Sequence, residues 1–79
     1  MNTQYLQTLP DDWEAVARVF SALGDATRQK ILLLFEPGES ISLKSLAELL
    51  PLSRTAVTHH VTTLVRAGLL QPSTRGREV

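Results

Sequence analysis

The stretch "LSRTAVTHHVTTLVRAGLL", residues 52–70, decides the fold of this 79-residue chain. Ser53 has the hydroxyl side chain that favours a helix N-cap, and Gly68 is typical of the turn that ends a helix. A helix over residues 54–67 is therefore predicted. At about 100° per residue, three of its apolar side chains fall on one face, which we expect to be buried. These are Val57, Val61 and Leu64.

The opposite face of this helix is polar and has no carboxylate. It carries short hydrogen-bonding side chains, a histidine and arginines: Ser53, Arg54, Thr55, Thr58, His59, Thr62 and Arg66. Threonine can bond base edges or phosphates, and arginine pairs with guanine or phosphate. A helix face that merely contacts water favours Glu, Lys and Gln over threonine, which is a mediocre helix former. The face therefore predicts a surface that reads DNA, with an ordinary solvated face as the alternative.

Adjacent histidines at the centre of this helix suggest a metal or catalytic site, but their spacing argues against chelation, and the lack of a second histidine or an acidic partner on the outward face argues against catalysis. His59 points outward, whereas His60 falls at the margin of the core, where we expect it to be half-buried and bonded to a backbone group. Chelation by a helix favours an i, i+4 pair. The chain has no cysteine and no acidic side chain beside His59 on this face. We predict no metal site, no cofactor and no enzymatic activity.

Two more helices are predicted before this one. Ser42 can cap a helix whose apolar stripe is Leu43, Leu46, Ala47 and Leu50, with a short break at Pro51-Leu52. Asp25 can cap a helix in "ATRQKILLLF", which "EPG" at 36–38 ends. The end of that helix is apolar nearly all round, so we expect it in the middle of the core. Arg28, near its start, is expected to bond carbonyls or Asp25.

The first helix has a capping signal and an apolar stripe. Asp11 can cap it with Glu14 as capping-box partner, and Gly24 ends it. The stripe consists of Trp13, Val16, Ala17 and Phe20. Part of it must cover the small core of so short a chain. The apolar remainder predicts a homodimer interface formed by Tyr5, Leu6, Leu9, Trp13, Val16 and Phe20.

The tail after the last helix predicts a wing. "TRG" followed by "REV" is typical of a hairpin turn whose second strand has barely begun. Arg75 and Arg77 would reach backbone phosphate or the minor groove, and a frayed basic tail is the alternative. The predicted fold is mainly α, a winged helix-turn-helix of four helices plus a short, incomplete β-hairpin wing. Residues 1–79 form one domain, with an N-terminal extension at 1–10 and the wing at 69–79.

Charge is divided unevenly along a chain whose formal net charge is zero. Residues 1–40 carry six acidic and three basic side chains, and residues 41–79 carry two acidic and five basic ones. A neutral protein with one basic half can still present a positive face to DNA. The longest apolar run, "ILLLF" at 31–35, is too short to span a membrane, so we expect a cytoplasmic protein without a membrane partner.

Two segments resemble the ArsR-type winged-helix repressors over residues 20–79. "ALGDATRQKILLLF" is similar to that family's "ALGDPTRxxIL", and "SLAELLPLSRTAVTHHVTTLVRAGLLQPSTRGREV" to its helix-turn-helix and wing. The resemblance implies a dimeric bacterial repressor that often releases DNA on binding a metal ion. It also implies base reading by Thr58 and His59 and a helix start at Ser53, Arg54 and Thr55. Where many members carry a Cys-x-Cys motif this chain has "SLKSLAELL", so thiolate metal sensing is excluded. The resemblance ends at Val79, before that family's returning wing strand and final helix.

The expected function is that of a sequence-specific DNA-binding transcriptional regulator of the repressor kind. It would insert the helix at 54–67 into the major groove of double-stranded DNA as a homodimer. Two alternatives remain open at this stage. One is a winged helix used as a protein-interaction module, and the other is an architectural DNA binder that responds to no inducer.

Overall fold

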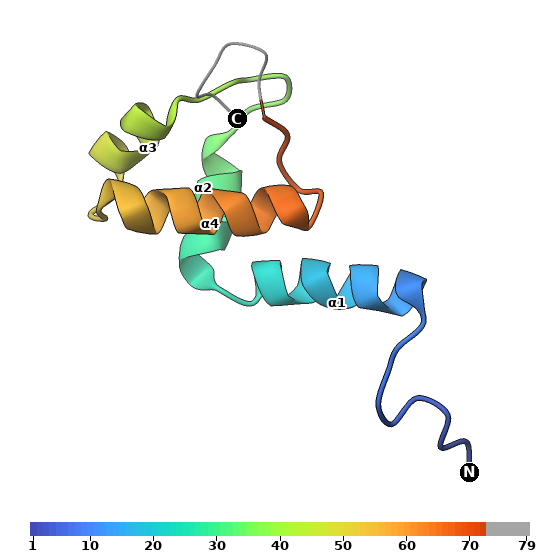
Figure 1. Ribbon diagram of the computed structural model, residues 1–79. Helices are drawn as coiled ribbons and strands as arrows, with labels where there is room; N and C mark the ends of the chain where they lie inside the picture. The colour runs from blue at the N-terminus through green and yellow to red at the C-terminus, as the bar shows by residue number, and fades with distance from the viewer. Residues whose placement is uncertain (73–79) are drawn as a thin grey trace.

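The computed structural model describes residues 1–72, which form a mainly helical unit (Figure 1). Its four helices are α1 (Asp11–Leu23), α2 (Ala26–Leu34), α3 (Leu43–Leu49) and α4 (Arg54–Arg66). Within residues 1–72 the structure contains no strand. Most of the predicted wing, including Arg75 and Arg77, lies outside the described residues. None of the helices in this range is long and apolar enough to cross a membrane.

Three helices begin at the caps that the sequence predicts. The side chains of Asp25, Ser42 and Ser53 each accept a hydrogen bond from the backbone N–H three residues later, at 3.0–3.1 Å. Each cap partners an N–H that has no acceptor within its own helix. At the other end of α4, Gly68 has a positive φ of 78°, and the N–H of Leu69 donates to the carbonyl of Leu64 at 2.9 Å. This Schellman turn ends α4 as expected.

The start of α1 differs from the prediction. Asp11 is not the N-cap but the first helical residue, and Pro10 holds the cap position without a side-chain hydrogen bond. The carboxylates of the first turn, on Asp11, Asp12 and Glu14, instead lie at the positive end of the helix dipole. Acidic residues here stabilise the helix by charge, so the sequence pattern marked the right region but the wrong residue.

The core is small and centres on α4. In the described part of the chain, six hydrophobic residues are buried: Ala22, Ile31, Leu46, Val57, Val61 and Leu64. One cluster joins α1, α2 and α4, and the other joins α3 to α4. Half-buried Phe35 and Leu50 pack against both clusters. Figure 1 shows α4 across the middle of the molecule, with α3 near its N-terminal end and the C-terminal end of α1 near its C-terminal half. The predicted inner face of α4 is confirmed.

The apolar stripe of α1 does not cover the core, contrary to the prediction. Trp13 is 61% exposed and Phe20 is 70% exposed, while Ala22 is the buried residue of the helix. The reason is that α1 packs through its C-terminal end, so its earlier turns extend past the other helices (Figure 1).

The end of α2 also lies less deeply than expected. Ile31 is fully buried, but Leu33 is 84% exposed and Leu34 is 38% exposed. Within residues 1–72, α2 packs against α1 and α4 on one side, and its remaining apolar side chains face outward. The prediction that the end of α2 lies in the middle of the core is therefore wrong for Leu33 and Leu34, although these residues are apolar.

Candidate nucleic-acid interface

The position of α4 is set by a short turn after α3. Four residues, from Leu50 to Ser53, separate the two helices. Leu50 and Leu52 are half-buried in this turn and pack against the α3–α4 cluster. The N–H of Leu52 donates to the carbonyl of Leu50 at 2.8 Å. Packing of these two leucines against the core therefore fixes the turn. The turn makes α3 and α4 the first and second helices of a two-helix unit.

The side of α4 opposite the core is open to solvent. We define the α4 outer face as Ser53, Arg54, Thr55, Thr58, His59 and Thr62. All six side chains are exposed except Thr62, which is half-buried. Apart from the capping hydroxyl of Ser53, no side chain of this face takes part in a hydrogen bond within residues 1–72. Its donors and acceptors are therefore free to meet a ligand.

The charge on α4 is purely basic. Arg54 begins the helix and Arg66 ends it, and no acidic residue lies between them. Both arginine side chains are exposed. A helix with cations at both ends and neutral hydrogen-bonding groups between them suits a polyanion whose bases carry mixed donors and acceptors.

His60 faces inward and holds a second set of contacts. Its Nδ1 lies 3.3 Å from Nη1 of Arg28. Because a guanidinium only donates, His60 Nδ1 must be the acceptor, which leaves the imidazole proton on Nε2. His60 is half-buried as expected, but its partner is a side chain of α2 and not a backbone group.

Arg28 joins three helices through the same guanidinium. Its Nε donates to the carbonyl of Ala22 at 2.8 Å, and its Nη2 donates to the carbonyl of Ser21 at 3.1 Å. We call Arg28, Ser21, Ala22 and His60 the Arg28 junction, because it ties the end of α1 and the middle of α4 to the start of α2. The backbone N–H of Arg28 also donates to the Asp25 carboxylate, and this bond lowers the pKa of Asp25 below its usual value.

The carbonyl contacts of Arg28 agree with the sequence expectation, whereas its contact with His60 was missed. The two residues are 32 positions apart, and neither a motif nor a periodicity connects them. Arg28 lies beside the Asp25 cap in "GDATR". The sequence signal for the carbonyl contacts is its position: a basic residue that closely follows the end of a helix can bond the last carbonyls of that helix.

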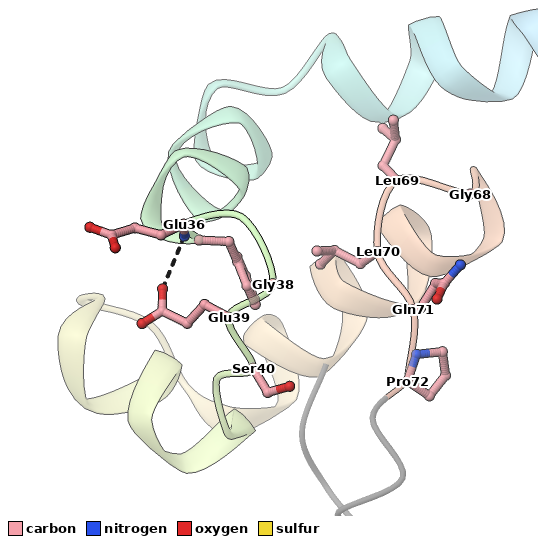
Figure 2. A pocket seen from close by; sticks show the side chains of 10 residues that line it. Glu36, Gly38, Glu39, Ser40, Gly68, Leu69, Leu70, Gln71 and Pro72 are labelled. Carbon is pink, nitrogen blue, oxygen red and sulfur yellow. Dashed lines mark hydrogen bonds between the residues drawn. The ribbon is translucent and has the colours of Figure 1, made fainter.

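A hollow elsewhere on the surface has the opposite charge. It lies between the α2–α3 loop and residues 68–72, and Figure 2 shows Glu36 and Glu39 on the loop side. The N–H of Glu36 donates to Oε1 of Glu39 at 3.0 Å. These carboxylates make the hollow unsuited to an anionic ligand. Within residues 1–72, no three His, Cys, Asp or Glu side chains are grouped so that they could hold a metal ion.

Comparison with protein families gives a match to the helix-turn-helix domain over residues 23–72, which is well over half of the chain. The chain belongs to the helix-turn-helix domain family. No curated protein and no solved structure matches it. The matched range starts at the last residue of α1 and includes α2, α3 and α4.

Membership of the helix-turn-helix family supports DNA binding and transcription regulation as the activity of this chain. In such domains the second helix of the unit enters the major groove, and the first crosses the backbone. In this chain, α3 and α4 are the first and the second helix of that unit. The structure brings the predicted reading residues together on the α4 outer face, while Arg75 and Arg77 lie outside the described residues.

Proposed function

We propose that this protein is a sequence-specific DNA-binding transcriptional regulator of the ArsR type, which represses by occupying its operator in the cytoplasm. The observation that carries this proposal is the α4 outer face, an exposed helix surface without a carboxylate on the second helix of a helix-turn-helix. It acts by binding and not by catalysis.

The geometry of α4 suits the major groove of double-stranded DNA. A helix of 13 residues is about 20 Å long, and the major groove is about 12 Å wide and admits one helix. Thr58 and His59 lie near the middle of the outer face, where they would meet base edges. Ser53, Arg54 and Thr55 lie at the N-terminal end, where they would also reach phosphate oxygens. The four-residue turn from Leu50 to Ser53 leaves α3 free to cross the backbone.

Replacing His59 with alanine should weaken operator binding by about 1–3 kcal/mol and affect random DNA much less, because base contacts are lost and phosphate contacts remain. The operator is first selected from a random duplex library with the wild-type protein. Fluorescence anisotropy then gives both affinities. Lys30→Gln, an exposed change on α2, is the control and should alter the ratio little.

Three other outcomes would contradict parts of this proposal. An equal loss on both DNAs would place His59 on phosphate. Failure to select any sequence, with salt-sensitive binding retained, would indicate an architectural binder. No salt-sensitive DNA binding at all would favour a protein-interaction module.

We also propose that the regulator is a homodimer. The N-terminal apolar surface consists of Tyr5, Leu6, Leu9, Trp13, Val16 and Phe20, and all six side chains are between 44% and 81% exposed. Tyr5, Leu9 and Trp13 line one shallow cavity, so the segment before α1 and the first turns of α1 form a continuous surface. Contiguous exposed apolar patches mark interaction sites. A second copy of the chain would cover this apolar surface. The dimer would then carry two α4 helices, one for each half-site of the DNA.

Replacing Trp13 with alanine should weaken dimer formation at least tenfold, or about 1.4 kcal/mol, since buried tryptophans dominate interfaces. Sedimentation velocity over a concentration series measures the change. Deleting residues 1–9 should act in the same direction. Leu33→Ala is the control, because Leu33 is also a large exposed apolar side chain, 84% exposed, but lies on α2. A dimer that is weakened by Leu33→Ala and not by Trp13→Ala would place the interface elsewhere.

A further inference from the structure

A small cavity lies between α1 and the C-terminal end of α4, outside the α4 outer face. Its volume is about 190 Å³, and we call it the α1–α4 cavity. Arg18 and Ser21 of α1 line one side, and Thr63, Arg66 and Ala67 line the other. Four of the five lining residues carry a polar or basic group, while their apolar stems and Ala67 provide the larger part of the lining surface.

The two arginines place two cationic groups at this cavity. Both side chains are exposed, and no hydrogen bond within residues 1–72 uses either guanidinium. The nearest acidic residue before Arg18 on α1 is Glu14, one turn earlier, and it does not line the cavity. Each guanidinium presents a planar fork of N–H donors that matches the oxygens of a phosphate group.

Two hydroxyl groups and the carbonyls at two helix ends are the other polar groups at this cavity. The Ser21 hydroxyl makes no hydrogen bond within residues 1–72 and is free to donate, whereas the Thr63 hydroxyl already donates to the carbonyl of His59 at 3.0 Å. Both helices point their negative dipole ends toward this region. The carbonyl of Ser21 is partnered by Gly24 and Arg28, and that of Thr63 by Ala67. Two full positive charges therefore outweigh partial negative charges that are already hydrogen-bonded.

The cavity is also in line with the α4 outer face. Arg66 follows His59 by seven residues, which is two helical turns or about 10 Å along the same side of α4. A helix that inserts His59 into the major groove places its flanking cations beside the sugar-phosphate walls of that groove.

We propose that the α1–α4 cavity is a phosphate-binding site in which Arg18, Arg66 and the Ser21 hydroxyl hold one phosphate of the DNA backbone. This inference rests on the proposed function for the source of the phosphate, but not for the site itself. A free inorganic or organic phosphate offers the same chemistry, so the test separates the two sources.

The DNA arm of the test uses Arg18→Gln. Arg18 is exposed and belongs to α1, so the change removes one charge and leaves the α4 outer face unaltered. The slope of log affinity against log salt should fall by roughly one unit, equally on operator and random DNA. Lys30→Gln removes the same charge from α2 outside the cavity and should leave the slope unchanged.

The phosphate arm needs no DNA. Inorganic phosphate is titrated into the full chain, and the Nε–Hε signals of Arg18 and Arg66 are followed by NMR. In the wild type both signals should shift together and saturate. In Arg18→Gln the shift of the Arg66 signal should weaken at least severalfold.

Each result then decides one part of the inference. Saturable phosphate shifts with a lower salt slope support a site for the DNA backbone. The same shifts with an unchanged slope support the site and assign it to a free phosphate. Absence of saturable shifts overturns the site whatever the slope. If the wild type binds no DNA, the proposed function fails while the phosphate titration still tests the cavity.

Discussion

Replacing Leu64 with alanine is expected to lower the free energy of unfolding by about 2–5 kcal/mol, the largest effect of any substitution considered. Leu64 is fully buried and packs with Ala22 and Ile31, so that it joins α4 to α1 and α2. Small domains have a free energy of unfolding of about 5 kcal/mol, at the low end of the usual range. The variant should therefore be largely unfolded under conditions in which the wild type is folded.

Urea denaturation followed by circular dichroism measures this change. Leu33→Ala serves as the control, since it removes the same atoms from a side chain that is 84% exposed and should change stability by about 0.5 kcal/mol or less. A loss below about 1 kcal/mol for Leu64→Ala would mean that the cluster of Ala22, Ile31 and Leu64 is packed differently.

Replacing Arg28 with methionine should have the second largest effect, a loss of about 2–4 kcal/mol. Methionine keeps the apolar stem but removes the donors that serve the carbonyls of Ser21 and Ala22 and Nδ1 of His60. Hydrogen bonds from a charged donor contribute about 1.5–3 kcal/mol each, and we discount the sum because the junction is partly exposed. Thermal and urea unfolding would give the difference.

Arg28→Lys separates charge from geometry. A lysine keeps the positive charge but lacks the planar fork, so it should recover only part of the lost stability. The imidazole resonances of His60 should also move in both variants, whereas those of His59 should move less. Full recovery by lysine would show that charge alone accounts for the contribution of Arg28.

Features that depend on nearby residues could be predicted from the sequence. The caps at Asp25, Ser42 and Ser53 each join a side chain to the backbone N–H three residues later, and the two faces of α4 follow from helical periodicity. The α4 outer face was predicted for the same reason, since the burial of Val57, Val61 and Leu64 determines which side remains exposed. Whether its residues read bases stays a prediction.

Features that depend on distant residues could not be predicted in this way. An amphipathic stripe shows that α1 has an apolar side, but it does not say whether the core or another molecule covers it. Trp13 and Phe20 are exposed because only the end of α1 reaches the core. The α1–α4 cavity and the contact between Arg28 and His60 likewise join residues far apart in the chain. No local pattern indicates such pairs.

The separation of the two sides of α4 has a consequence for evolution and for engineering. The inner side supplies Val57, Val61 and Leu64, half of the residues that are buried within 1–72, and tolerates little change. The exposed positions Arg54, Thr55, Thr58 and His59 support no part of the core, and surface substitutions of this kind usually change stability by less than about 0.5 kcal/mol. Under the proposed function, binding specificity can therefore drift or be redesigned by combinatorial variation at these positions while the scaffold stays folded. A duplicated copy of such a protein could acquire a new operator without first acquiring a more stable fold.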